Sequence, residues 1–482
     1  MAHTGTDGRA LDRPRVSPAY HPSPADRVLD SALEMSGDVR RDWARVRAHL
    51  EAGGDLLARP LPDRRRDAVT RACRAARTRF MAAHAEGVYD ELTDGRRRYA
   101  RLDELAYAAA ERYPGLTPTR EQIAGDRKAV QADKQGWELD QGILFWGLFA
   151  APVAGEHLLR AMLRPTRAAV ALAAGFARSG KAEFPTATLE RRDGIGYITV
   201  RNERYLNAED DTVVEDLESA VDLALLDDGI EVGALRGGTM THPRYAGRRV
   251  FNAGINLTHL HQGKIGFLDF LLRREVGYIS KLVRGLERPD SGRPYGDEKP
   301  WIGAVDTFAI GGGTQITLVL DWVVAAEDAY FTLPAMREGI IPGAANFRLH
   351  RVMGSRRTRQ VIFGDRRYEA DGPEGRLLCD EVVPPAEMDT AIEEAARRLR
   401  GPAAIVNRRM LRMAEEPLAL FREYMACYAL EQSRLLYSPE LIVNLERKWI
   451  GRSREPGLGE SRESDPCGTK TPERARESWK RD

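Results

Sequence analysis

The sequence is poor in several features that mark particular classes of protein. Among its 482 residues there are only four cysteines, Cys73, Cys379, Cys427 and Cys467, and no Cys-x-x-Cys pair. This spacing gives no zinc ribbon and no disulfide framework, and it is typical of a reducing compartment. The N-terminal segment also lacks the apolar stretch of a secretory signal. We therefore expect a cytoplasmic protein.

Net charge and long apolar runs are missing as well. The chain has 73 Lys+Arg against 72 Asp+Glu, a formal charge of +1, so it lacks the positive field of proteins that wrap nucleic acid. The uncharged run 142–155 is shorter than the ~20 residues needed to cross a bilayer. We therefore expect neither a nucleic acid nor a membrane as partner. With 43% hydrophobic residues the chain can bury large cores, and its length predicts two or three domains.

The chain changes in character along its length. Residues 1–26 are rich in Pro, Arg and Ser, and 451–482 are charged and aperiodic, so both are expected to be disordered or extended tails. Between 27 and 186 apolar residues recur at helical spacing, which predicts an all-helical N-terminal domain. Helical and strand patterns alternate over 187–400, which predicts an α/β catalytic core. Residues 401–450 return to helix and are expected to complete the active site or a trimer interface.

Individual elements follow from periodicity. A hairpin is expected at 188–191 and 195–200, around the turn Asp193-Gly194. One helix is expected over 27–51 and another, strongly amphipathic, over 264–286. The other predicted elements are helices 67–91, 102–112, 154–177, 211–228 and 314–320, and strands 230–235, 301–306 and 322–325.

Two glycine-containing turns carry the first chemical signal. FNAGINL at 251–257 and AIGGGTQ at 309–315 each place small residues directly after a predicted strand. Small residues let a ligand approach the backbone closely, and free N–H groups at the start of a helix bind anions. Two such groups aimed at one point would form an oxyanion hole. Either turn alone is more often a packing turn, so the signal lies in their combination.

The order of the segments is more specific than either turn. The series GYITVRNERYLNA at 196–208, FNAGINL at 251–257 and IGGGTQITLVLDWVVAAEDAYFTLPAMREGIIPGA at 310–344 resembles the crotonase (enoyl-CoA hydratase/isomerase) superfamily. The resemblance covers residues 188–400 and implies a spiral of ββα units, a CoA thioester ligand and an oxyanion hole. Its donors would be the backbone N–H groups of Ile255 and Gly312, each worth about 3 kcal/mol to an enolate.

The hydratases of this superfamily use two catalytic carboxylates, and this chain has a different residue at each of the two positions. Gln315 stands three residues after the middle glycine, and Ala335 follows the proline of the next loop. An amide and a methyl group cannot act as general acid and base. Ordinary hydratases also lack a helical N-terminal extension. In Gln315 and in this extension the chain resembles a branch of the superfamily, the cofactor-independent dioxygenases acting on 3,5-dihydroxyphenylacetyl-CoA.

This branch implies a reaction without a metal or an organic cofactor. The substrate enolate would react with O2 and release CoA and 3,5-dihydroxyphenylglyoxylate, within the dihydroxyphenylglycine branch of glycopeptide antibiotic biosynthesis. The residues themselves indicate no metal set, because His259 and His261 lack a nearby carboxylate cluster, and no GxGxxG fingerprint is present. The resemblance further implies a trimer-based homo-oligomer, with a hexamer expected.

The resemblance also gives roles to side chains. Glu209 and Arg274 would orient the phenolic groups of the substrate, Gln315 would lie near the thioester, and Arg249 would contact the CoA phosphates. Each has a plainer interpretation, Glu209 as a charge at a helix N-terminus and the two arginines as solvated surface groups. The apolar O2 pocket would comprise Ile255, Leu257, Ala335 and Ile340. By the plainer interpretation these four residues are an ordinary part of the core.

Two alternatives remain open. Another crotonase-fold reaction, by an isomerase, a thioesterase or a C–C bond hydrolase, differs from the dioxygenase in consuming no O2. A non-catalytic acyl-CoA-binding or scaffold protein would also lack the hydratase carboxylates, and it would hold the thioester unchanged.

Overall fold

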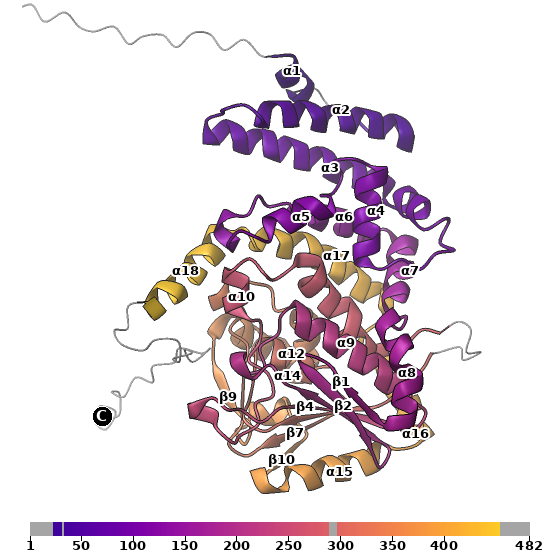
Figure 1. Ribbon diagram of the computed structural model, residues 1–482, viewed down its shortest axis with the longest axis vertical. Coiled ribbons are helices and arrows are strands. Elements are labelled where there is room, and N and C mark those ends of the chain that lie inside the picture. The colour runs from indigo at the N-terminus through magenta and orange to yellow at the C-terminus, as the bar shows by residue number, and fades with distance from the viewer. Residues whose placement is uncertain (1–22, 31–32, 289–295, 454–482) are drawn as a thin grey trace, which may run out of the picture. The chain divides into compact units, whose positions relative to one another are not determined.

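The computed structural model describes residues 23–30, 33–288 and 296–453 (Figure 1). By its internal contacts the chain separates into two compact units, Met1–Ala76 and Arg77–Asp482. Most of the two predicted tails, including Cys467, lies outside the described residues. The helical ends extend slightly into both tails, since helix α1 begins at Pro24 and helix α18 continues to Ser453. The predicted boundaries near 186 and 400 stay predictions.

The first unit is built from helices. The single helix predicted over 27–51 is wrong, because α1 (Pro24–Asp30) ends early and α2 (Val39–Leu57) starts anew. The side chain of Asp38 accepts a hydrogen bond of 2.8 Å from the amide of Arg41, and such an N-cap marks a helix start inside an otherwise periodic stretch. A small apolar core in this unit contains Leu29, Leu56, Val69 and Cys73.

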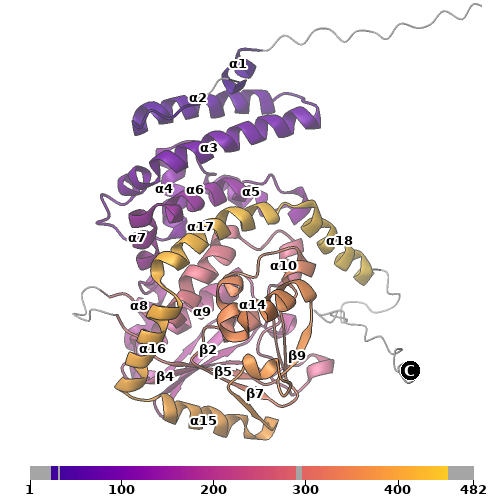
Figure 2. The same cartoon turned by 180° about the vertical axis from the view of Figure 1, so that it is seen from behind.

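Helices continue to residue 179, as the spacing predicts. The single helix predicted over 154–177 is wrong, because two helices, α7 and α8, occupy this stretch, and the strand β1 (Lys181–Glu183) lies inside the range predicted to be all-helical. Towards the C-terminus helices return, and α17 lies along α6 in both views (Figures 1 and 2). By length and composition no single helix of the described residues could cross a bilayer, and one pair bent by 107° could, Glu138–Ala150 with Pro152–Ser179. The helices of these two regions are α3 (Asp63–Leu92), α4 (Leu102–Arg112), α5 (Arg120–Asp126), α6 (Glu138–Ala150), α7 (Pro152–Met162), α8 (Arg167–Ser179), α15 (Met388–Leu399), α16 (Pro402–Glu415), α17 (Leu418–Leu435) and α18 (Pro439–Ser453).

A seven-stranded sheet forms the centre of the α/β region, in the order β1-β2-β3-β4-β5-β7-β10. The first two pairings are antiparallel, which confirms the predicted hairpin, and the others are parallel. Helix α9 (Asp211–Leu226) packs on one face and α15 on the other (Figure 1). The strands are β1 (Lys181–Glu183), β2 (Ala187–Arg192), β3 (Ile195–Val200), β4 (Val232–Gly237), β5 (Trp301–Val305), β7 (Trp322–Ala326) and β10 (Glu381–Val383).

A smaller sheet, in the order β6-β8-β9, completes the predicted repeat. Strands β2 and β3 lead into α9, β5 and β6 lead into α12, and β7 and β8 lead into α13. Each is a ββα unit, so the predicted α/β spiral with helices before and after it is confirmed. The remaining elements are β6 (Phe308–Ile310), β8 (Tyr330–Thr332), β9 (Arg367–Glu369), α10 (Leu257–His261), α12 (Gly312–Thr317), α13 (Ala335–Glu338) and α14 (Ala345–Gly364).

The continuous helix predicted over 264–286 is wrong in its geometry. Two π-helical segments, η4 (Phe267–Leu272) and η5 (Glu275–Ile279), precede the short helix α11 (Ser280–Arg284). Gly277 has non-helical angles, φ −92° and ψ −111°, and interrupts the ladder inside η5. Apolar spacing alone cannot distinguish this arrangement from a regular helix, whereas π-helical turns occur mostly at functional sites.

Candidate active site

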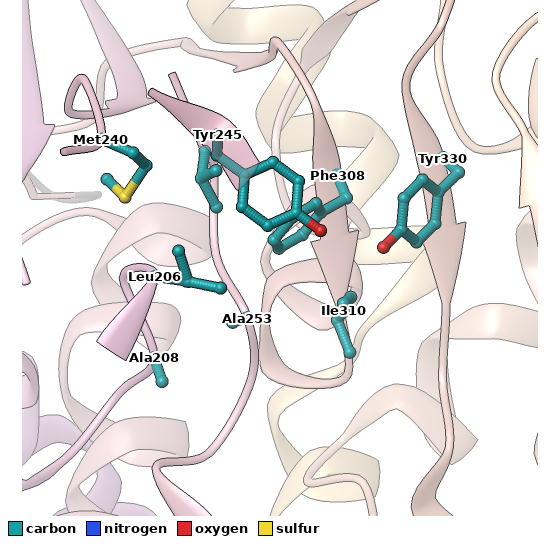
Figure 3. Packing of buried hydrophobic residues seen from close by; sticks show 9 residues of the cluster. Leu206, Ala208, Met240, Tyr245, Ala253, Phe308, Ile310 and Tyr330 are labelled. Carbon is teal, nitrogen blue, oxygen red and sulfur yellow. The ribbon is translucent and has the colours of Figure 1, made fainter. Parts of the chain in front are cut away.

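A buried apolar cluster lies behind three short segments of the site (Figure 3). Ala208, Ala253 and Ile310 belong to it, and each stands directly before a residue or turn with a predicted role. The aromatic side chain of Phe308 packs within 5.4 Å, centroid to centroid, of the rings of Tyr245 and Tyr330. Because these side chains pack together in one buried cluster, the positions of the three segments relative to one another are fixed.

The two glycine turns converge, as the resemblance implies. The amide of Ile310 donates to the carbonyl of Asn252 at 3.0 Å, so the two chains run side by side. Gly254 has φ +86°, which favours glycine, and a Cβ there would lie 3.1 Å from the carbonyl of Ile310 and 3.5 Å from the amide nitrogen of Gly312. The close approach of the two turns therefore depends on Gly254.

Two amides in these turns have no hydrogen-bond partner in the part of the chain that the structure describes. Glu209 donates to Gly254 at 2.7 Å and accepts from Asn256 at 2.8 Å, so the amide of Ile255 between them faces away from this pairing. Gly312 is the first residue of α12, where an amide has no intrahelical acceptor. Both residues line one pocket, the arrangement that an oxyanion hole requires.

This pocket has an empty volume of about 470 Å³, including its open mouth. It brings together most of the residues that the sequence analysis singled out, and no described residue before 209 lines it. The lining consists of Glu209, Ile255, Phe270, Leu271, Arg274, Glu275, Gly311, Gly312, Gln315, Ala335, Glu338, Ile340, Ile341, Pro342, Gly343 and Tyr428.

Arg274 is the centre of a buried polar network. Its Nε lies 3.1 Å from each carboxylate oxygen of Glu209, and its Nη2 donates to Glu209 Oε2 at 2.8 Å. The same Nη2 donates to the carbonyl of Gly312 at 2.8 Å. Nη1 donates to Glu275 Oε1 and to Gln315 Oε1, both at 2.8 Å. One guanidinium group therefore connects the second glycine turn with the polar wall of the pocket, and it reaches the first turn through Glu209, whose backbone pairs with Gly254 and Asn256.

The charges in this network stabilise one another. Burial by itself lowers the pKa of Arg274, but Glu209, Tyr278 and Glu275 together outweigh it and raise that pKa well above its ordinary value. Burial also raises the pKa of Tyr278, whose hydroxyl donates to Glu209 Oε1. Arg274 thus stays charged and Tyr278 stays protonated at neutral pH. The plainer interpretation of Arg274 as a solvated charge is wrong, because its side chain is 4% exposed.

The amide of Gln315 is oriented by its contact with Arg274. Because Oε1 accepts from Nη1 of Arg274, Nε2 carries two protons that are not used in this bond. Gln315 is buried and lines the pocket one helical turn after the amide of Gly312. The side chain can therefore donate a hydrogen bond to a ligand but cannot accept a proton.

The first turn is fixed by a second set of contacts, centred on Asp210. Its Oδ1 accepts from the amide of Val213 at 3.2 Å and caps α9. Its Oδ2 lies 3.3 Å from Nδ2 of Asn256 and 2.9 Å from Nδ1 of His259. Asn256 in turn caps α10 by accepting from the amide of His259 at 3.1 Å. These bonds hold Asn256, directly after Ile255, and they show that His259 does have a neighbouring carboxylate.

Two predicted site residues lie outside the pocket lining. Leu257 is half-buried at the start of α10, and Arg249 donates from Nη1 to the carbonyl of Gly237 at 3.2 Å. Burial, together with the charge of Arg236, lowers the pKa of Arg249. The predicted contributions of Leu257 to an O2 pocket and of Arg249 to CoA binding stay predictions.

Several lining residues were not anticipated. Glu275 follows Arg274 directly. Tyr278 lies outside the pocket lining and stands four residues after Arg274, so helical spacing offered a signal for it. Glu338 stands one turn after Ala335 in α13. Tyr428 comes from a distant helix, and its hydroxyl donates to the carbonyl of Leu271 at 3.5 Å, a contact without any local sequence signal. Within 23–30, 33–288 and 296–453 no group of three or more His, Cys, Asp and Glu side chains could hold a metal ion.

Comparison with known proteins supplies the family. The family model for enoyl-CoA hydratase/isomerase matches residues 190–420. The chain is 58% identical over 369 residues to the (3,5-dihydroxyphenyl)acetyl-CoA 1,2-dioxygenase of Amycolatopsis orientalis, which covers 77% of this chain and 85% of that protein. The chain belongs to the enoyl-CoA hydratase/isomerase family.

Other members of the enoyl-CoA hydratase/isomerase family are more distant. A probable enoyl-CoA hydratase of Rhizobium meliloti is 29% identical over 213 residues, 44% of this chain and 73% of that protein. A crystal structure of an enoyl-CoA hydratase from Mycobacterium avium subsp. paratuberculosis covers 55% of this chain and 99% of its own, with 22% identity and a TM-score of 0.46. The family resemblance inferred from the three segments at 196–208, 251–257 and 310–344 is confirmed by the family model and by the dioxygenase of Amycolatopsis orientalis.

Proposed function

We propose that this chain is a dioxygenase that converts 3,5-dihydroxyphenylacetyl-CoA and O2 to 3,5-dihydroxyphenylglyoxylate and free CoA. The observation that carries the proposal is the 58% identity to a dioxygenase acting on that thioester, over 85% of its length. The pocket supports it, since two unpartnered amides meet there while Gln315 and Ala335 stand where hydratases have carboxylates. The enzyme therefore stabilises an enolate without the groups that activate water.

The reaction begins when the α-proton leaves and its electron pair passes into the enolate. The amides of Ile255 and Gly312 donate to the enolate oxygen, and they are aimed before the charge develops. The carbanion is oxidised by O2 and forms a C–O bond, which gives an α-peroxide. The distal oxygen attacks the thioester carbonyl and the C–S bond breaks, so CoA leaves as a thiolate, which takes up the first α-proton and becomes the free thiol. The second α-proton leaves as the O–O bond breaks, and both oxygen atoms remain in the product.

The proposal extends to cofactors, substrate contacts and assembly. The reaction uses neither a metal nor an organic cofactor, Glu209 and Arg274 act as one unit towards the ring hydroxyls, and Ile255, Ala335 and Ile340 surround O2. The enzyme works in the cytoplasm in glycopeptide antibiotic biosynthesis as a trimer-based hexamer. Apolar side chains on α16 support association between copies, because four of them are more than half exposed: Val406, Met410, Leu411 and Met413.

The test follows dissolved O2 and free CoA thiol together, using the purified, metal-analysed protein with 3,5-dihydroxyphenylacetyl-CoA. One mole of O2 per mole of thiol, unchanged by chelators and absent under anaerobic conditions, is the expected result. Thiol release that persists without O2 would instead indicate a thioesterase. Binding of the thioester without turnover would favour a non-catalytic acyl-CoA-binding protein.

A further inference from the structure

Three carboxylates line the pocket among the described residues, and two of them are fully engaged. Glu209 receives Nε and Nη2 of Arg274 and the hydroxyl of Tyr278. Glu275 receives Nη1 of Arg274 at 2.8 Å and the amide of Ala344 at 3.1 Å. Both oxygens of each of these two carboxylates therefore already accept a hydrogen bond from the protein.

Glu338 is the third carboxylate and has a different environment. The structure shows no hydrogen bond shorter than 3.5 Å to its oxygens in the part of the chain that it describes. Its nearest cation is Nζ of Lys448, 3.7 Å from Oε1. Burial raises the pKa of the Glu338 carboxyl, and the charges of Lys448 and Arg337 only partly oppose this. Of the three carboxylates, Glu338 is therefore the one whose oxygens accept no hydrogen bond within 3.5 Å from the described residues, and its lone pairs are free for a substrate proton.

The position of Glu338 in the helix connects it with the hydratase pattern. Ala335 and Glu338 are the first and last residues of α13, so they are three apart and neighbours on the helix surface. Both line the pocket together with Ile255 and Gly312. Glu338 therefore lies one helical turn from the position at which hydratases have a carboxylate, and both residues line the pocket.

We propose that Glu338 is the base that removes the α-proton of the acyl-CoA substrate. In this step the carboxylate takes the proton, the C–H electron pair enters the enolate, and the negative charge moves to the thioester oxygen at the two amides. The small side chain of Ala335 leaves room for the substrate carbon between Glu338 and the oxyanion hole. The assignment rests on the proposed function, because it presupposes an aryl-acetyl thioester in this pocket.

Helix α18 contacts Glu338 and the end of α13. Besides Lys448, it contributes Asn444, whose Nδ2 donates to the carbonyl of Arg337 at 3.0 Å. A Cβ on Gly339 would lie 3.4 Å from Cα of Leu441, so the end of α13 packs closely against α18. The charged groups that act on Glu338 are Lys448, Arg337 and, more weakly, Asp365.

The decisive experiment measures exchange of the α-hydrogens with D2O by NMR in the absence of O2, which isolates proton removal from the oxygen chemistry. We expect Glu338→Gln to slow exchange and O2 uptake at least 100-fold while the dissociation constant of the thioester changes less than threefold. Glu338→Asp should recover part of the rate. Exchange in the wild type should rise with pH through one ionisation that the Gln variant lacks.

A matched control is Glu440→Gln, which makes the same substitution at an exposed carboxylate of α18 and should leave the exchange rate unchanged. Exchange by Glu338→Gln at the wild-type rate would overturn the assignment. So would a wild-type protein that binds the thioester and exchanges no deuterium. If the wild type exchanges deuterium but consumes no O2, the dioxygenase reaction fails while the base at Glu338 stands.

Discussion

The guanidinium of Arg274 and the carboxylate of Glu209 form a two-pronged ion pair that is buried on both sides. The pair joins residues 65 positions apart, with side chains that are 4% and 0% exposed. A charged pair in such surroundings is tolerated only when nearly all of its hydrogen-bonding groups are used. Tyr278, Glu275, Gln315 and the carbonyl of Gly312 use the remaining ones. The pair therefore couples the stability of the core to the geometry of the oxyanion hole.

This coupling predicts non-additive effects on stability. Arg274→Met leaves Glu209 buried without its cation and should lower the free energy of unfolding by about 3–5 kcal/mol. Glu209→Gln should destabilise the protein as well, because Arg274 then loses its main counter-charge. Urea unfolding of the double variant should show a loss well below the sum of the two single losses, whereas additive losses would mean that the pair is not coupled.

Gln315→Glu should affect turnover much more than binding. The new carboxylate still accepts from Arg274, so the fold tolerates it, but the two protons on Nε2 disappear and a negative charge faces the enolate. We expect kcat for O2 uptake to fall about 100-fold with a small change in KM. Gln360→Glu, at an exposed position of α14, provides the control. Unchanged kinetics in the Gln315 variant would remove this residue from the site.

Gly312→Ala tests the crowding around the second turn. A Cβ at this position would lie 2.5 Å from Oε2 of Glu209 and 3.1 Å from Nη2 of Arg274, so the ion pair would have to shift. We expect kcat to fall at least tenfold in steady-state assays of thiol release. Gly175→Ala, with open space around its Cβ in α8, should leave activity unchanged. Equal activity of both variants would show that the second turn is not part of the site.

The stability of the C-terminal region should depend on acid through Glu416. Burial favours the neutral carboxyl, but Arg348 and Arg284 hold the pKa of Glu416 at about 2. A carboxyl with a lowered pKa stabilises the fold above its unfolded pKa and loses that effect as pH falls. Relative to the wild type, Glu416→Gln should lose about 3 kcal/mol at pH 7, measured by urea unfolding. This difference should shrink between pH 5 and pH 3, and a constant difference would contradict the assignment.

Local signals in the sequence identified a large part of the site. Ile255 and Gly312 stand in glycine turns, and the small residues of these turns predict an accessible backbone amide. Gln315 stands three residues after Gly312, and Ala335 directly follows the proline of the next loop. The hairpin around Asp193-Gly194 was equally visible, because strand alternation and turn chemistry are properties of a few neighbouring residues. Helical periodicity also predicted the long N-terminal run, but not the break at Asp38, where one capping side chain outweighs the apolar spacing.

The sequence by itself thus determined the family, the two turns and the loss of the hydratase carboxylates. Only the tertiary structure decided that Arg274 faces Glu209 and Gln315 at once, since this depends on the π-helical path through η4 and η5. It also decided that Glu338 and Tyr428, which stand far apart in the sequence, line the same pocket. The physical reason is range. Spacing along the chain reports local conformation, whereas burial, pKa and the partners of a charged group are set by segments that meet only after packing.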